Sequence, residues 1–238
     1  MNKSQINEIS LKGLPIALAV IIIWLLTLSF SLSLDLNSFS IPLTIFIFFF
    51  MTFLYTGLFI TAHDAMHGIV FPKNKKINDF IGTLSVLLYA LFSFKLLLTE
   101  HHKHHDHSGT LEDPDFHDGQ HKSFFAWYYN FLSNYISWKQ ILGMAILFNI
   151  LLHLLKIPVE NLILFWVAPS LLSTFQLFFF GTYLPHREGK VAFVDKHNAR
   201  SNNLNTFLSF ITCYHFGYHL EHHRYPYVPW WKLPSTRK

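Results

Sequence analysis

The chain has 238 residues, and its composition is typical of a membrane protein. Hydrophobic residues make up 51% of it and charged residues only 13%, whereas soluble domains carry about 25% charged residues. The net charge of +4 is modest, and the basic residues flank apolar segments instead of lining a polar groove with aromatic residues, which argues against nucleic acid as a partner. The single cysteine, Cys213, excludes an intrachain disulfide and is expected to be a small apolar residue on a buried helix.

Four apolar stretches have the roughly 20 residues that a helix needs to cross a bilayer. They are residues 14–34, 41–62, about 137–155 and about 162–183. The first follows Lys3 and Lys12, as a secretory signal would, but it is too long for a signal core and no small-x-small cleavage site follows, so we expect a retained helix. Residues 80–98 are apolar but interrupted by Lys95, which predicts a dipping hairpin or an interfacial helix, and residues 204–217 are too short to cross.

The basic residues are distributed unevenly between the two ends of these stretches. The short connections 35–40 and 156–161 hold one of the eighteen lysines and arginines, Lys156, and nearly all the others lie in the N-terminus, in residues 72–140 or in the C-terminal tail. The positive-inside rule then places both termini in the cytoplasm. We therefore predict an all-α membrane protein, a single integral-membrane domain over residues 1–238, with about four transmembrane helices in two hairpins.

Three clusters of histidine follow apolar stretches and are predicted to lie on the cytoplasmic side. They read His63-Asp-Ala-Met-His67, His101-His-Lys-His104-His105-Asp-His107 and His219-Leu-Glu-His222-His223. Helical residues three or four apart share a face, and neutral imidazole is a metal ligand, so each cluster is expected to present its ring nitrogens in one direction. Low-complexity metal capture is the alternative for a histidine-rich tract, but here the spacing is helical and the three segments are far apart. Eight candidate ligands exceed what one tetrahedral zinc needs and suit two metal ions. They are His63, His67, His101, His104, His105, His219, His222 and His223.

The residues around the clusters leave several roles open. Imidazole binds zinc, copper, iron and nickel alike, so ligand type alone does not identify the metal. Four carboxylates next to the clusters could either accept the second ring N–H or be solvated interfacial charges: Asp64, Glu100, Asp106 and Glu221. Seven further histidines are left outside the set: His102, His107 and His215 without a predicted role, His153 and His197 as interfacial anchors, and His117 and His121 as surface or supporting groups.

The histidine boxes resemble those of the membrane fatty-acid desaturase and hydroxylase superfamily. The second box reads His-x-x-His-His-x-x-Ser-x-Thr over residues 101–110, as desaturase boxes do. The resemblance implies two iron ions held by histidines on a cytoplasmic helical cap above four transmembrane helices. It also implies a ninth ligand just after the last span, where His186 lies in Phe-Gly-Thr-Tyr-Leu-Pro-His-Arg, residues 180–187.

Four longer phrases resemble bacterial β-carotene ketolases of the 4,4′-oxygenase type. They are residues 53–68, Asp-Pro-Asp-Phe-His (113–117), Tyr-Leu-Pro-His-Arg (183–187) and residues 213–223. This resemblance extends from about residue 40 to the C-terminus. It implies an enzyme of the inner (cytoplasmic) membrane that oxidises ring carbon 4 of β-carotene with O₂, by two hydroxylations and loss of water.

Substrate and electrons must both reach such a site. A carotenoid is expected to enter from the bilayer through an apolar slot, while most aromatic residues of 124–138 are expected to form an interfacial belt. The sequence holds no haem, flavin or Fe–S motif, so an external donor, a ferredoxin-like protein, is expected to dock on a basic face. The candidate residues of that face are Arg187, Lys190, Lys196 and Arg200.

Other functions remain open at this stage. A carotenoid hydroxylase, a fatty-acyl desaturase or an alkane hydroxylase would use the same metal centre. A metal transporter or sensor would hold its ligands near the bilayer midplane, often on broken helices, whereas these boxes fall at the ends of spans. A structural membrane anchor would leave the histidines unexplained.

Overall fold

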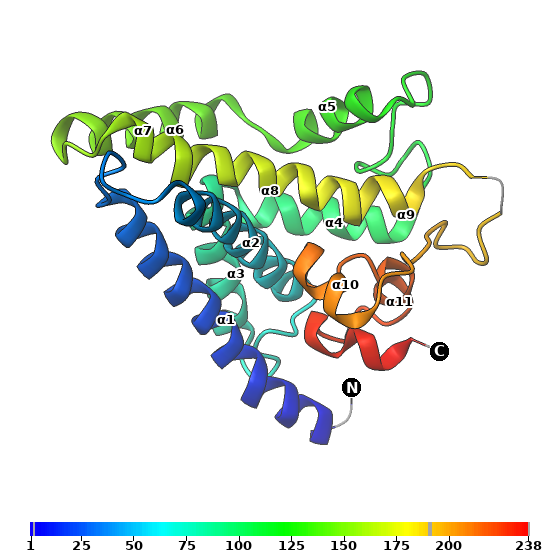
Figure 1. Cartoon of the computed structure of the whole chain (residues 1–238). Helices are drawn as coiled ribbons and strands as arrows, with labels where there is room; N and C mark the ends of the chain where they lie inside the picture. The colour runs from blue at the N-terminus through cyan, green and yellow to red at the C-terminus, as the bar shows by residue number, and fades with distance from the viewer. Residues whose placement is uncertain (2, 190–191, 238) are drawn as a thin grey trace.

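The structure is a computed structural model that describes residues 1, 3–189 and 192–237. All regular elements in this part of the chain are helices, which confirms the all-α prediction (Figure 1). In chain order they are α1 (Lys3–Leu32), α2 (Ile41–Met66), α3 (Lys75–Ala90), α4 (Phe94–His107), α5 (Phe124–Tyr135), α6 (Trp138–Asn149), η1 (Ile150–Leu154), α7 (Val159–Leu162), η2 (Ile163–Val167), α8 (Ala168–Phe178), η3 (Phe179–Tyr183), α9 (Leu184–His186), α10 (Thr206–Cys213), α11 (His219–Arg224) and η4 (Trp230–Thr236).

Three of the described helices are long and apolar enough to cross a membrane. They are α1, α2 and the continuous helix Val159–His186, which runs from α7 to α9. They contain the stretches expected at 14–34, 41–62 and 162–183, apart from the last two residues of the first stretch. Large apolar side chains such as Ile22, Leu26, Phe46 and Phe49 remain exposed on α1 and α2. Such a surface suits lipid rather than water.

Two further apolar segments are bent. Helices α3 and α4 meet at 102°, and α5 meets the helix Trp138–Leu154 at 86°. The first corner begins where Leu91 ends α3 with a φ of 56°, and α4 then starts with the Ser93 side chain accepting a hydrogen bond from the Leu96 N–H. The stretch 80–98 is therefore a corner between two helices, and the expected span at 137–155 is the second arm of a bent pair. The described helices supply three spans, or up to five if each bent pair is one span.

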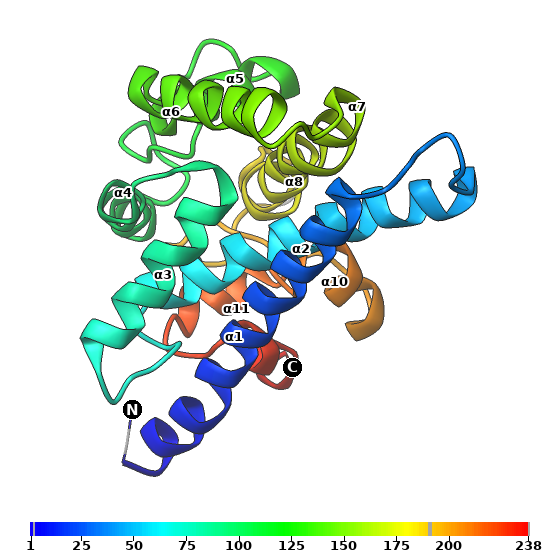
Figure 2. The same ribbon diagram turned by 90° about the vertical axis from the view of Figure 1, so that its left-hand side faces the viewer.

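Helix α2 is the centre of the packing. Figure 2 shows it between α1 and α8, with α3 and α4 to one side and α5 and α6 beyond α8, and α1, α3 and α8 all contact it. Its side chains Met51, Tyr55 and Leu58 are fully buried. Helix α2 is thus held on several sides, which fixes the position of the histidines at its C-terminal end.

The two ends of the molecule differ in what they hold. The connections 33–40 and 155–158 lie together at one end, on the left of Figure 1, where the Asn161 side chain donates to the backbone carbonyl oxygens of Ser31 (3.1 Å) and Leu34 (2.8 Å). The C-terminal ends of α2 and α4, together with α9 and α11, gather at the other end (Figure 1). The start of α1 reaches the same end, because Glu8 forms an ion pair with Lys232 at 2.7 Å. This is the end that holds the histidines.

Candidate metal centre

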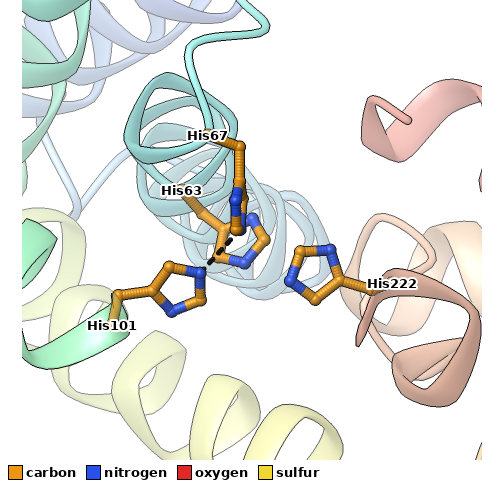
Figure 3. Close-up of side chains that lie close together, drawn as sticks. All are labelled: His63, His67, His101 and His222. Atoms are coloured by element: carbon orange, nitrogen blue, oxygen red, sulfur yellow. Dashed lines mark hydrogen bonds between the residues drawn. The ribbon is translucent and has the colours of Figure 1, made fainter. Parts of the chain in front are cut away.

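Four histidines from three separate segments form a first cluster. His63, His67, His101 and His222 each place a ring nitrogen within 4.8 Å of the others, a spacing that could hold a metal ion. Figure 3 shows the four rings facing one another, from the end of α2, from α4 and from α11. The Nε2 atoms of His67 and His101 are 2.7 Å apart. We call these four residues the first group.

A second cluster of four lies beside it. His104, His186, His219 and His223 also place ring nitrogens within 4.8 Å of one another. The Nε2 atom of His223 is 3.1 Å from that of His104 and 3.0 Å from that of His219. All four residues are buried. We call them the second group.

His105 lies between the two groups. Its Nε2 atom is 3.0 Å from the Nε2 of His222 in the first group, and its ring is stacked on that of His223 in the second, with 4.3 Å between the centroids. The structure therefore brings all nine histidines predicted from the sequence together, in two sets of four with His105 between them.

Helical spacing explains which histidines of the second box point inward. On α4, His104 and His105 follow His101 by three and four residues and share its face, while His102 and His107 fall on the other face and are exposed. His107 forms an ion pair with Glu112 at 2.9 Å. Three of the five rings thus lie in the clusters, and the exposed ring of His102 is 6.5 Å from that of His67 at the edge of the first group.

The remaining histidines serve other purposes. His215 is buried and stacks on Tyr218 (5.6 Å between centroids). His117, expected as a surface or supporting group, is buried against Trp127 (4.9 Å). His121 and His153 are exposed. The ring of His197, expected as an interfacial anchor, lies 5.7 Å from that of His223, next to the second group.

Hydrogen bonds to the outer ring nitrogens fix two tautomers in the second group. His104 Nδ1 donates to both carboxylate oxygens of Asp113 (2.9 and 3.0 Å), and His186 Nδ1 donates to the backbone carbonyl oxygen of Asn198 (2.8 Å). A carbonyl can only accept, and a carboxylate anion likewise, so these protons lie on Nδ1 and the Nε2 lone pairs face the cluster. This is the arrangement that metal-binding histidines usually have.

Unpaired nitrogens also fit a metal. The Nε2 atoms of His63 and His186 are buried and have no hydrogen-bond partner among the described residues. Buried polar atoms without a partner are rare, and an ion in each group would satisfy them. Burial, and then the neighbouring rings, lower the pKa values of His67, His219, His222 and His223. These imidazoles are neutral near pH 7, the form that binds a metal.

The four carboxylates considered from the sequence do not make these hydrogen bonds. Asp64 accepts from the Trp230 N–H (3.1 Å) and lies 3.6 Å from His63 Nδ1, beyond hydrogen-bonding distance. Glu100 pairs with Lys103, Glu221 accepts from the Ser201 hydroxyl, and Asp106 is exposed. Sequence neighbours of the histidines point away from them, because adjacent residues on a helix face different directions.

Asp113 was missed as a partner of His104. It lies nine residues beyond His104, in the loop between α4 and α5, where the chain has turned back on the helix. The only signal in the sequence was its place in the phrase Asp-Pro-Asp-Phe-His. That phrase indicates a family resemblance but does not reveal that Asp113 contacts His104.

An apolar cavity lies against the two groups. His63, His101, His104 and His219 form its histidine-lined side, and the rest of the lining is mostly apolar: Phe59, Met66, Phe92, Leu97, Phe131, Leu132, Leu177 and Phe216. A second groove lies between α6 and α8. It shares four lining residues with the cavity: Tyr89, Phe92, Leu132 and Thr174. The two hollows therefore adjoin, and a path of mostly apolar side chains leads from the outer surface of the helices to the histidines.

The aromatic residues of 124–138 divide between cavity and surface. Phe131 and Tyr135 line the cavity, whereas Phe125, Tyr129 and Trp138 are exposed. The exposed members have the character expected of an interfacial belt. The segment therefore supplies part of the cavity wall together with exposed aromatic side chains.

Comparisons with known proteins agree with this site. A family model described as fatty acid desaturase matches residues 37–141 and 133–238. A β-carotene ketolase of Paracoccus sp. (strain N81106 / MBIC 01143) is 46% identical over 188 residues, which covers 79% of this chain and 76% of the relative. A zeaxanthin 4-ketolase of Chlamydomonas reinhardtii is 44% identical over 191 residues, 79% of this chain and 43% of that longer relative. An omega-6 fatty acid desaturase of Glycine max matches more distantly, at 31% identity over 83 residues, 34% of this chain and 21% of the desaturase.

These matches confirm the resemblance expected from the histidine boxes and the four longer phrases. The match spans about three quarters of the bacterial relative but less than half of the algal one. The chain therefore belongs to the fatty acid desaturase family and, within it, to the β-carotene ketolases.

Proposed function

We propose that this chain is a di-iron, O₂-dependent β-carotene ketolase that converts the ring carbon 4 methylene to a ketone, giving echinenone and then canthaxanthin. The observation that carries the proposal is the convergence of nine histidines from four separated places, in a chain 46% identical to a named ketolase. A transporter is disfavoured, because the rings form a closed pair of clusters at one end of the helices.

The first group is proposed to hold one iron and the second group the other, with His105 completing the set between them. Iron is taken from the family, since imidazole alone leaves the metal open. Two irons and O₂ supply, when bound, the oxidising power that no side chain has. Asp113 and the Asn198 carbonyl orient His104 and His186 so that their Nε2 lone pairs point inward.

The apolar cavity is proposed to hold the substrate ring. A carotenoid is as apolar as lipid, so it would leave the bilayer along the groove between α6 and α8 and reach the histidines past Tyr89 and Leu132. The mostly apolar lining excludes water from the reacting carbon. Two hydroxylations at carbon 4 give a geminal diol, which becomes the ketone when one C–O bond breaks and the departing oxygen leaves as water with both diol protons.

The membrane placement is also a proposal. The whole chain would form one integral-membrane domain in the inner membrane, with α1, α2, the helix Trp138–Leu154 and the helix Val159–His186 as four spans. Helices α4, α10 and α11 would cap them on the cytoplasmic side. The positive-inside rule supports this orientation, because the connections at the opposite end hold one of eighteen basic residues, Lys156.

Electrons are proposed to come from a ferredoxin-like protein docking on the basic segment after α9. Arg187 and Lys196 are exposed there, Arg200 donates to the Arg187 carbonyl oxygen at 2.8 Å, and Lys190 lies outside the described residues. An acidic donor would be attracted to such a surface. Arg187→Glu with Lys196→Glu should raise the donor concentration needed for half-maximal turnover, and an unchanged requirement would contradict this docking site.

Pigment analysis tests the proposed function. The full chain is expressed in cells that make β-carotene, with His222→Ala as the inactive control, and carotenoids are separated by chromatography. Echinenone and canthaxanthin are expected only with the unaltered chain. Zeaxanthin or a newly unsaturated lipid in their place would contradict the proposal and favour a hydroxylase or a desaturase.

A further inference from the structure

One acidic side chain lies in the wall of the otherwise mostly apolar cavity. Among the described residues that line it, Asp115 is the one carboxylate, and Tyr135 lies beside it. The Tyr135 hydroxyl donates to Asp115 Oδ1. The other oxygen, Oδ2, is 3.8 Å from His104 Nδ1 and accepts no hydrogen bond from the described residues. The Asp115 side chain is 15% exposed, so Oδ2 can accept a hydrogen bond from a ligand in the cavity.

The backbone around Asp115 is held rigidly by α5. Trp127 Nε1 donates to the Asp115 carbonyl oxygen (2.7 Å), Asn134 to that of Pro114 (2.7 Å) and Asn130 to that of Phe116 (3.1 Å). Three consecutive carbonyl groups are thus fixed by three side chains of one helix. Preorganised polar groups of this kind bind a ligand with little loss of entropy.

Hydrogen bonding to His104 does not explain the pairing of Asp115 with Tyr135. Asp113 already accepts from His104 Nδ1 with both oxygens, at 2.9 and 3.0 Å. Asp115 is farther away, and its partner Tyr135 belongs to α5 and not to the histidine clusters. The two aspartates therefore differ in position: Asp113 bonds to His104, whereas Asp115, 3.8 Å from the same nitrogen, lines the cavity.

We propose that Asp115 and Tyr135 form the hydrogen-bonding site for a hydroxyl group on the substrate ring. The inference rests on the proposed ketolase function. Ketone formation needs two oxidations at one carbon, and the alcohol made by the first must stay in place for the second. Asp115 Oδ2 accepts from that hydroxyl, while Tyr135 holds the carboxylate in position. A hydroxyl already present on the neighbouring ring carbon 3 offers the same chemistry.

Product partition is the first test. Tyr135→Phe and Asp115→Leu are compared with Tyr129→Phe, an exposed tyrosine of the same helix that does not line the cavity. The ratio of 4-hydroxylated to 4-keto carotenoid should rise about tenfold in the first two variants, because a hydrogen bond to a charged group is lost, and stay unchanged in the control. The ratio is compared at equal total conversion of β-carotene, because partial loss of metal alone also leaves more of the alcohol unconverted. A structural effect on His104 is then separable.

Binding distinguishes the source of the hydroxyl. The iron-loaded full chain is titrated without O₂ with β-carotene, 3,3′-dihydroxy-β-carotene and 4,4′-dihydroxy-β-carotene. Tighter binding of the 4-hydroxylated probe that is lost in Tyr135→Phe assigns the site to the newly made alcohol. The same result with the 3-hydroxylated probe assigns it to a substrate hydroxyl. Both outcomes support the proposal.

Two results would overturn it: no preference for either hydroxylated probe, or the same preference and product ratio in the unaltered chain and both variants. Absence of any carbon 4 product from the unaltered chain would instead contradict the proposed ketolase function. The binding experiment would still show whether the pair prefers a hydroxyl, so the two failures are distinguishable. Tyr135→Phe removes one oxygen atom only and keeps the test usable if Asp115→Leu does not fold.

Discussion

The two histidine groups differ in how their rings are held. In the second group, His104 and His186 have their outer nitrogens hydrogen-bonded to Asp113 and to the Asn198 carbonyl, and all four rings are buried. In the first group, Asp64 is 3.6 Å from His63, too far for such a bond, and His67 is only partly buried. Two rings of the second group are thus oriented by protein groups outside the clusters, whereas we find no such hydrogen bond to a ring of the first group among the described residues. We expect the two sites to respond differently to mutation.

Removing a ligand from either group should have the largest effect. His186→Ala in the second group and His222→Ala in the first should each lower ketone formation more than about a hundredfold, because both irons are required for the chemistry. Metal analysis of the purified variants should find about one iron per chain instead of two. If either variant keeps normal iron content and product, that histidine is not an essential ligand.

Substitution of the carboxylate beside each group tests directly whether the two groups are held differently. Asp113→Asn should reduce metal affinity or turnover about 10- to 100-fold, since it removes the acceptor that fixes the His104 tautomer. Asp64→Asn, the matched change beside the first group, should cost less than about threefold. Iron retention during dialysis against a chelator measures both. Equal sensitivity of the two variants would show that the groups are not organised differently.

Acid should destabilise the metal-free protein through the buried rings of both groups. Burial lowers the pKa values of His219, His222 and His223 below 6.5 in the folded chain, so below that pH the unfolded chain binds protons that the folded chain does not. The contribution of these three rings to the free energy of unfolding should be level above pH 6.5 and fall below it, by up to about 1.4 kcal/mol per pH unit for each ring. The raised pKa values of His104 and Asp115 contribute in the opposite sense. Denaturant unfolding in detergent at several pH values checks this. The fall should be smaller in His219→Phe, and an equal fall in that variant and in the unaltered chain would contradict neutral buried imidazoles.

The exposed histidines of the second box should matter least. His102→Ala and His107→Ala leave the inward face of α4 intact, and exposed substitutions usually change stability by less than about 0.5 kcal/mol. Iron content should stay normal and ketone formation within about twofold. A loss of iron in either variant would mean that the helical face has been assigned wrongly.

Helical spacing in the sequence predicted which histidines point inward, but not which residues hydrogen-bond to them, because those residues lie in loops. His101, His104 and His105 share a face because of the geometry of one helix, which can be recognised in the sequence. Asp113 and Asn198 reach their rings through loops, where no periodic pattern indicates which residue faces the site. Glu100 and Glu221, considered either as partners of a ring N–H or as solvated charges, bond to Lys103 and Ser201, since neighbours in sequence need not be neighbours in space.

The fold likewise has features that the sequence predicts and features that it does not. The apolar lengths of α1, α2 and the helix Val159–His186 were predictable from hydropathy alone. The 86° bend between α5 and the next helix was not, because residues 124–155 are apolar on both sides of it. That bend places Tyr135 at the cavity, so the part of the fold that hydropathy missed is the part that shapes the proposed substrate site.

The central claim is that nine imidazoles hold two metal ions in one chain. Its most direct test is the iron content and ⁵⁷Fe Mössbauer spectrum of purified, active protein. We predict two irons per chain in nitrogen-rich, coupled sites, with activity proportional to iron. Full ketone formation by protein that contains one transition-metal ion per chain, or none, would contradict the account.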